Sequence, residues 1–132
     1  LQKYLKKIIE DFESGKIVSL KGEKRSCELE YQHHKSFIGV SLMHLVTGEE
    51  TNHQMSCHLV RVEPNCNLDT HIHGENLEIH EVIAGTGICY LENNKYEYAQ
   101  GTITIIPAGS SHKVVAGEDG LYILAKFTPA LL

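Results

Sequence analysis

The sequence predicts an all-β domain, folded as an antiparallel sandwich or closed barrel, after one short N-terminal helix. From residue 16 onward, short runs rich in Ile, Val, Tyr and Thr are separated by Gly, Asn and Pro, a pattern typical of strands and turns. No helical pattern lies between these runs, so a parallel sheet of alternating strands and helices is not supported. The length of 132 residues suits one domain. Closing the sheet would remove the exposed edges that many short strands leave.

Residues 1–14 predict an amphipathic helix, because apolar side chains recur on one face at helical spacing and charged ones lie opposite. The apolar face consists of Leu1, Leu5, Ile8, Ile9 and Phe12, with Tyr4 beside them. Gly15 is the residue type that commonly ends a helix, so we expect a helical unit at 1–15 and one barrel domain at 16–132. The apolar face needs a surface to cover, which is either the outside of the barrel or a second subunit.

The expected strands are short and closely spaced. They fall at 16–20, 26–31, 36–46, 54–63, 68–73, 77–84, 86–92, 95–98, 102–106, 112–116 and 121–127. Residues 92–95, Glu-Asn-Asn-Lys, predict a hairpin turn because Asn tolerates positive φ. Residues 48–50, Gly-Glu-Glu, predict another turn.

Composition and charge exclude several classes of partner. The net charge is −5 and no basic stripe is present, so nucleic acid is not expected as a partner. The apolar runs are much shorter than the roughly 20 residues that span a bilayer, and the N-terminal segment lacks the apolar core of a signal peptide. We therefore expect a cytoplasmic protein without membrane contact. The four cysteines have no C-x-x-C spacing, which fits neither a disulfide framework nor a thiolate zinc site.

Four residues have the spacing of a metal site. His71 and His73 are two apart, so on a strand both imidazoles leave the same face. A tight turn before Glu78 can return its carboxylate to the same point, and the turn-rich residues 107–111 can direct His112 inward. Three imidazoles and a carboxylate suit one divalent ion, whether Fe, Mn, Ni, Co, Cu or Zn, and they leave coordination positions open.

The same residues carry two motifs. The first, G-x5-H-x-H-x3–4-E-x6-G, is matched by Asn65, His71, His73, Glu78 and Gly85. The second, G-x5-P-x-G-x2-H-x3-N, is matched by Gly101, Pro107, Gly109 and His112, and Ala116 stands at the place of the closing Asn. Through these motifs the chain resembles the cupin superfamily, in particular its small single-domain members. The resemblance covers residues 65–116.

The resemblance implies a jelly-roll barrel whose interior holds a metal ion, with His71, His73, Glu78 and His112 as the ligands. Asn65 replaces the opening glycine of the first motif, a mild change because Asn tolerates the left-handed conformation. The Asn-to-Ala change at position 116 removes a polar group but no ligand. Many small cupins form dimers, so the resemblance and the apolar helix face together favour a homodimer. Light scattering that returned only the 14.8 kDa monomer would contradict this expectation.

Residues near the motifs are candidates for the metal surroundings. If Glu78 points inward, strand alternation places His80 and Val82 on the same inner face. For residues 54–63 the sequence does not decide which face is inside. Because a metal pocket needs polar groups to orient ligands and substrate, the candidate substrate-pocket residues are His58, His80, Tyr90, Tyr122 and Lys126.

Two hypotheses about function follow. The first is a small metalloenzyme acting on a small organic substrate, for which the resemblance implies dioxygenase, isomerase or lyase chemistry. The second is a non-enzymatic module that binds or senses a small molecule or the metal. No catalytic residue beyond the ligands is assigned. A metal open to solvent favours catalysis, whereas a metal sealed by apolar side chains favours a structural role.

Overall fold

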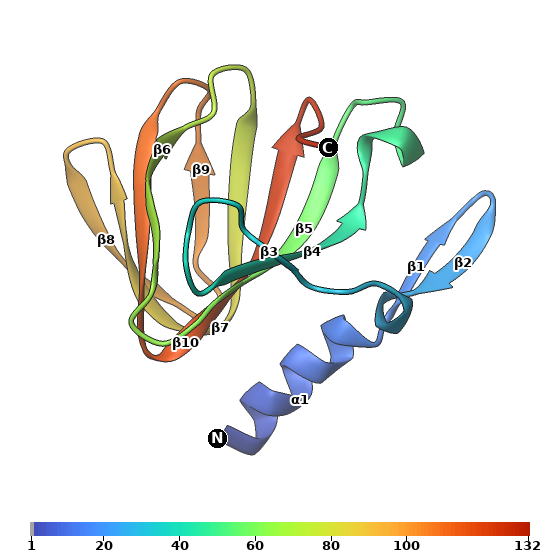
Figure 1. The fold of residues 1–132 in the computed structure, drawn as a ribbon, viewed down its shortest axis with the longest axis horizontal. Helices are drawn as coiled ribbons and strands as arrows, with labels where there is room; N and C mark the ends of the chain where they lie inside the picture. Colours follow the sequence, from blue (N-terminus) through green and yellow to red (C-terminus); the bar gives the residue numbers. More distant parts are fainter. Residues whose placement is uncertain (1) are drawn as a thin grey trace.

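The computed structural model describes residues 2–132, with side chains from residue 6 onward. After helix α1 (Gln2–Glu13) the chain consists of strands, which Figure 1 shows wrapped around a common interior. The strands are β1 (Lys16–Ser19), β2 (Gly22–Arg25), β3 (Gln32–His33), β4 (Val40–Val46), β5 (Ser56–Val62), β6 (Asn67–Ile72), β7 (Leu77–Leu91), β8 (Asn94–Ala99), β9 (Ile103–Ile106) and β10 (Ser111–Thr128). The predicted all-β architecture with one N-terminal helix is confirmed.

The main sheet has the order β3-β4-β5-β10-β7-β8, with β6 also paired to β10 and β9 also paired to β7. Every one of these pairs is antiparallel, as predicted. The hairpin of β1 and β2 forms a separate two-stranded sheet. In Figure 1 this hairpin and α1 lie outside the barrel.

The two longest strands differ from the sequence prediction. Residues 77–84 and 86–92 form one strand, β7, and residues 112–116 and 121–127 form one strand, β10. Gly85, at φ 86°, does not end β7, because it lets the backbone pass against the carbonyl oxygen of Gly120, where a Cβ would clash. The pairing of β7 with β10 shifts register between Ala116 and Leu121 and then continues.

Of the other predicted strands, the one at 26–31 is wrong and the one at 36–46 is wrong in part. Residues 26–31 contain a 3-10 turn (Ser26–Glu28), because the hairpin turns at Gly22 and its second strand is complete by Arg25. The segment 36–46 is a strand only from Val40, after a turn in which the Val40 N–H donates to the Phe37 carbonyl.

Of the two predicted turns, the first is confirmed as a hairpin turn. Leu91 pairs with Asn94, and Glu92 rather than an Asn adopts positive φ, at 53°. Residues 48–50 form a 3-10 turn within the longer β4–β5 connection. That turn is closed by a capping box between Thr47 and Glu50.

Apolar side chains form two clusters, one on each face of the sheet. The inner cluster includes Val60, Val62, Val82, Val114 and Ile123. The outer cluster consists of the buried residues Met43, Leu45, Leu59 and Leu124, and the N-terminal residues Ile17, Leu29 and Tyr31 pack against it. The sequence left the orientation of β5 open, and the structure places His58, Val60 and Val62 on the inner face.

Helix α1 confirms the predicted helix and lies against β7. Of its predicted apolar face, Leu1, Tyr4 and Leu5 lie outside the residues whose side chains are described. Ile8 and Ile9 are half-buried, whereas Phe12 is exposed. An interface between two copies at this face stays a prediction. No helix within residues 2–132 is long and apolar enough to cross a membrane.

Candidate metal centre

The structure brings the four predicted ligand residues together from three strands. His71 lies on β6, His73 directly follows β6, Glu78 opens β7, and His112 lies near the start of β10. His71 pairs across the sheet with His112. A hydrogen bond joins the turn after β6 to the turn before β10: the Gly109 N–H donates to the His73 carbonyl at 2.9 Å. One ligand atom from each of the four side chains lies within 4.8 Å of all the others, so this group could hold a metal ion.

Two buried polar atoms of this group face each other without a hydrogen bond. Glu78 Oε1 lies 3.1 Å from His112 Nε2 and 3.8 Å from His73 Nε2. Within the described part of the chain, neither Glu78 Oε1 nor His112 Nε2 has a hydrogen-bond partner. A buried polar atom without a partner is costly, by about 1–3 kcal/mol. A cation at this point would contact both atoms, and the donor set of three imidazoles and a carboxylate fits a divalent metal.

Hydrogen bonds on the far side of the rings orient two of the imidazoles. His71 Nδ1 lies 2.7 Å from the Asp69 carbonyl oxygen, and His112 Nδ1 lies 3.3 Å from that of Ser110. A carbonyl only accepts, so in each ring Nδ1 carries the proton and donates it. With a metal bound, Nε2 of each ring would then offer its lone pair, which is the state of a metal-ligating histidine.

Local electrostatics favour the protonation states that a metal requires. Burial, reinforced by the neighbouring His112 and His73 rings, lowers the pKa of His71 to about 4, although the Asp69 carbonyl opposes the shift. Burial also lowers the pKa of His73. For Glu78, burial opposes ionisation, but His80 and His112 outweigh it and hold the pKa well below its usual range. At neutral pH the group therefore offers neutral His71 and His73 imidazoles and an ionised carboxylate.

The second oxygen of Glu78 belongs to a buried chain of hydrogen bonds. Glu78 Oε2 lies 2.9 Å from His80 Nε2, and His80 Nδ1 lies 2.9 Å from the Tyr98 hydroxyl. Strand alternation predicts the inward position of His80, and the structure agrees. Sequence reasoning missed Tyr98 because it lies on β8, outside both motifs. Its only sequence signal is a place on a predicted strand just before the second motif begins at Gly101.

The other pocket candidates are not part of this group. His58 is buried in the interior, but its ring contacts His44 and Ser56 instead of the four ligand residues. Tyr122 packs against the outer apolar cluster, and Lys126 makes an outer-face ion pair with Glu81 at 2.7 Å. Both residues alternate with the inward-facing Ile123, Ala125 and Phe127, which explains why they point away from the interior.

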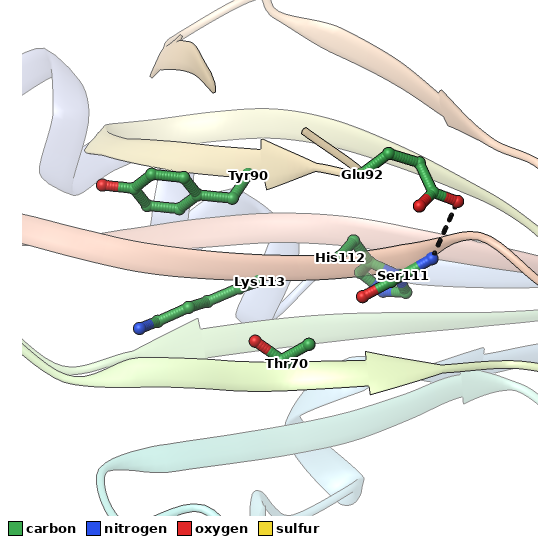
Figure 2. A pocket seen from close by; sticks show the side chains of 6 residues that line it. All are labelled: Thr70, Tyr90, Glu92, Ser111, His112 and Lys113. Atoms are coloured by element: carbon green, nitrogen blue, oxygen red, sulfur yellow. Dashed lines mark hydrogen bonds between the residues drawn. The ribbon is translucent and has the colours of Figure 1, made fainter. Parts of the chain in front are cut away.

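Tyr90 lies in a groove that shares one residue, His112, with the metal group. Figure 2 shows the groove lined by Thr70, Tyr90, Glu92, Ser111, His112 and Lys113. The Ser111 N–H donates to Glu92 Oε1 at 3.3 Å along this groove. Thr70, Ser111 and Lys113 alternate along their strands with the inward-facing His71 and His112, so the groove lies on the outer face of the sheet. Of the five pocket candidates, only His80 contacts the predicted ligands.

The fold and this group define a small β-barrel with an interior His/Glu cluster that could hold a metal. Residues 58–124, just over half of the chain, match the family described as the cupin domain. The chain belongs to the cupin family, and the resemblance predicted from the motifs is confirmed. A search of curated proteins found no match.

Several solved structures share the fold. A predicted oxalate decarboxylase of Thermotoga maritima is similar with a TM-score of 0.73 and 21% identity, covering 80% of this chain and 96% of that one. KdgF from Halomonas sp. is similar with a TM-score of 0.69 and 19% identity, covering 78% and 90%. Oxalate decarboxylase of Bacillus subtilis, described with Mn(II) centres, has a TM-score of 0.69 and 18% identity, and the match covers 80% of this chain and 29% of that one. At these identities the likeness establishes the jelly-roll fold alone.

Proposed function

We propose that this protein is a small metalloenzyme that holds one divalent ion through His71, His73, Glu78 and His112 and acts on a small organic substrate. The observation that carries the proposal is the pair formed by Glu78 Oε1 and His112 Nε2, buried and 3.1 Å apart with no hydrogen bond in the described residues. A bound ion would supply Lewis-acid or redox chemistry at coordination positions that the four side chains leave open.

The exposure of the group favours catalysis over a sealed structural site. Glu78 and His112 are buried, whereas His71 and His73 are only half-buried. The His73 side chain is 24% exposed, so a small molecule can approach the group from that side. A structural zinc site would more often use thiolates, and the ligand group contains none.

The surroundings of the group indicate a compact substrate without several negative charges. The Phe37 ring lies 5.8 Å from the His71 ring, and the Phe127 ring lies 5.0 Å from the His73 ring, which makes the adjacent wall apolar. The basic residues of β5 and β10, which are Arg61, Lys113 and Lys126, lie on outer faces by strand alternation. No inward lysine or arginine from these strands would pair with a phosphate. We therefore propose a small organic molecule that presents an oxygen donor, converted by dioxygenase, isomerase or lyase chemistry.

The test begins with metal content. Protein purified without a metal-binding tag is stripped with chelator and titrated with Mn²⁺, Fe²⁺, Co²⁺, Ni²⁺, Cu²⁺ and Zn²⁺. We expect one site per chain that is lost in His112→Ala and kept in the matched control His33→Ala, whose side chain is exposed on β3. Equal binding by both variants would overturn the proposed site.

The second stage measures turnover. Each metal-loaded form is screened against oxalate, diketones, flavonols, keto acids and sulfur compounds, with the His112→Ala protein as the blank. Oxalate is included because one of the similar folds is an oxalate decarboxylase and another is described as a predicted oxalate decarboxylase. Turnover that requires His112 supports the enzyme. Metal binding without turnover of any substrate would overturn the enzyme and favour the binding or sensing module.

A further inference from the structure

We propose that Tyr98 is a positioning residue for the metal ligand Glu78 and acts through His80. This inference rests on the proposed metal site. The chain of contacts runs from the Tyr98 hydroxyl to His80 Nδ1, at 2.9 Å, and from His80 Nε2 to Glu78 Oε2, at 2.9 Å. It fixes one oxygen of the carboxylate and leaves Oε1 directed at the imidazoles of the ligand group.

The three side chains are buried together. Tyr98 is 1% exposed, His80 is 2% exposed and Glu78 is 4% exposed. Glu78 and His80 are two apart on β7 and share its inner face, while Tyr98 reaches them from β8, which pairs with the far half of β7. Because these three hydrogen-bonded side chains are closed to solvent, water cannot readily replace one of them when it is removed.

The chemistry of the groups sets the direction of the hydrogen bonds. An ionised carboxylate only accepts, so His80 Nε2 carries the proton that Glu78 Oε2 receives. When the ring carries that single proton, Nδ1 accepts, and the Tyr98 hydroxyl is the donor that it faces. Burial, reinforced by the nearby Cys89 thiol, raises the pKa of Tyr98, so the hydroxyl keeps its proton. Tyr98 thus supplies the hydrogen bond that Nδ1 needs in the His80 tautomer that holds Glu78 in place.

Removal of the Tyr98 hydroxyl should therefore change the metal site, although Tyr98 reaches the ligand Glu78 only through His80. In Tyr98→Phe the buried His80 Nδ1 has lost its hydrogen-bond donor, so the ring is no longer held on that side. The ring can then tilt to relieve the unpaired nitrogen, which weakens the hydrogen bond from His80 Nε2 to Glu78 Oε2 and lets the carboxylate rotate. If Tyr98 only fills the core, the phenyl ring fills the same space and the metal site is unchanged.

The experiment compares Tyr98→Phe with Tyr90→Phe, a matched control whose ring is on the outer face and 38% exposed. Stripped proteins are titrated with Co²⁺ while the visible absorption bands are recorded. We expect Tyr98→Phe to bind Co²⁺ about 10-fold or more weakly and with altered bands, which is the usual effect of losing a group that orients a ligand. Tyr90→Phe should match the wild type. Wild-type affinity and bands in Tyr98→Phe would overturn the inference.

A double-mutant cycle tests whether Tyr98 acts through His80. In His80→Gln the amide can donate to Glu78 without help from Tyr98, so adding Tyr98→Phe to this background should weaken Co²⁺ binding less than 2-fold. Equal losses in both backgrounds would overturn the route through His80. If the wild type binds no Co²⁺, the proposed function and this inference fail together, whereas equal tight binding by all variants overturns this inference alone.

The tautomer can also be measured without any variant. Nitrogen-15 NMR of the metal-free protein should show His80 with its proton on Nε2 and none on Nδ1. This readout remains decisive if Tyr98→Phe does not fold, because a wild-type His80 protonated on Nδ1 alone would overturn the proposed direction of the hydrogen bonds.

Discussion

Two groups of buried and half-buried histidines lie in the same barrel interior, and they differ in how their polar atoms are paired. In the pair His44–His58, the two Nδ1 atoms lie 2.8 Å apart, and His58 Nε2 lies 2.8 Å from Ser56 Oγ. Ser56 Oγ in turn accepts from the Leu131 N–H at 2.8 Å. In the ligand group, Glu78 Oε1 and His112 Nε2 have no such partner in the described residues.

This difference shows that burial of histidines does not by itself mark a metal site. The His58 ring has a partner at both nitrogens, so nothing further is needed to compensate its burial. The ligand group also contains a carboxylate and leaves two atoms facing each other unpaired. We expect metal affinity to depend on the ligand group and the stability of the metal-free fold to depend on the His44–His58 pair.

The largest effect should come from Glu78→Gln. Glutamine keeps the shape of the side chain but removes the negative charge of the ligand group, so the affinity for a divalent ion should fall by about 100-fold or more. A 100-fold loss corresponds to about 2.8 kcal/mol of binding free energy. Competition titration against a chromophoric chelator measures it. His58→Gln should bind within about 3-fold of the wild type, and an equal loss in both variants would remove the distinction between the two groups.

Much of the fold and the ligand group could be predicted from the sequence, because both depend on short-range patterns. Short runs rich in Ile, Val, Tyr and Thr between turn residues identified most of the strands, and the spacing of His71, His73, Glu78 and His112 identified the group that the structure brings together. Strand ends were harder to predict. Gly85 reads as a turn residue in the sequence, but in the structure it allows close approach of Gly120, a contact made only after folding.

The surroundings of the group could be predicted only where they share a strand with a ligand. His80 follows from Glu78 by alternation, and the structure confirms its inner position. Tyr98 reaches His80 through pairing of β8 with β7, and the sequence does not state which residues of β8 will face that point. Tyr122 and Lys126 looked suitable as polar groups, but the register of β10 turns both outward.

The second-largest expected effect is the stabilisation of the folded protein by the metal. An ion that binds only the folded state adds about 2.7 kcal/mol at a free concentration 100 times its Kd. We expect a rise in Tm on addition of metal to the wild type and to His58→Gln, and little rise in Glu78→Gln at the same metal concentration. Scanning calorimetry with and without chelator measures the change. A similar rise in all three proteins would place the bound ion away from Glu78.

A smaller effect should appear in the pH dependence of the metal-free fold. Burial, reinforced by His44 from β4 and opposed by Glu78 from β7, lowers the pKa of His58 from 6.5 to about 4. Between these values the unfolded state binds more protons than the folded state, so stability falls as pH falls from about 6.5 towards 4. The contribution of His58 is complete above pH 6.5, and each pH unit inside the window costs up to about 1.4 kcal/mol.

Urea unfolding at pH 7 and pH 5 measures this slope in metal-free protein. His58→Gln cannot titrate, so its stability should fall by about 2 kcal/mol less than that of the wild type over this range. Its stability at pH 7 should be lower than that of the wild type, because the amide does not reproduce both contacts of the ring. Identical slopes in the two proteins would mean that the pKa of His58 is not lowered in the folded state. The His44–His58 pair would then not be shielded from solvent as the structure indicates.

The smallest effect is expected on the outer face, at the Lys126–Glu81 ion pair. Its side chains are 35% and 33% exposed and its atoms lie 2.7 Å apart. Partly exposed pairs contribute about 0.2–1 kcal/mol, so Lys126→Met should lower the free energy of unfolding by that amount while keeping the packing of the aliphatic chain. Metal affinity should stay within 2-fold, because β10 directs Lys126 away from the ligand group. The control is Glu81→Gln, which removes the same ion pair from the other side. A 10-fold loss of metal affinity or turnover in Lys126→Met alone would show that Lys126 acts at the metal site and would contradict the separation of inner and outer faces.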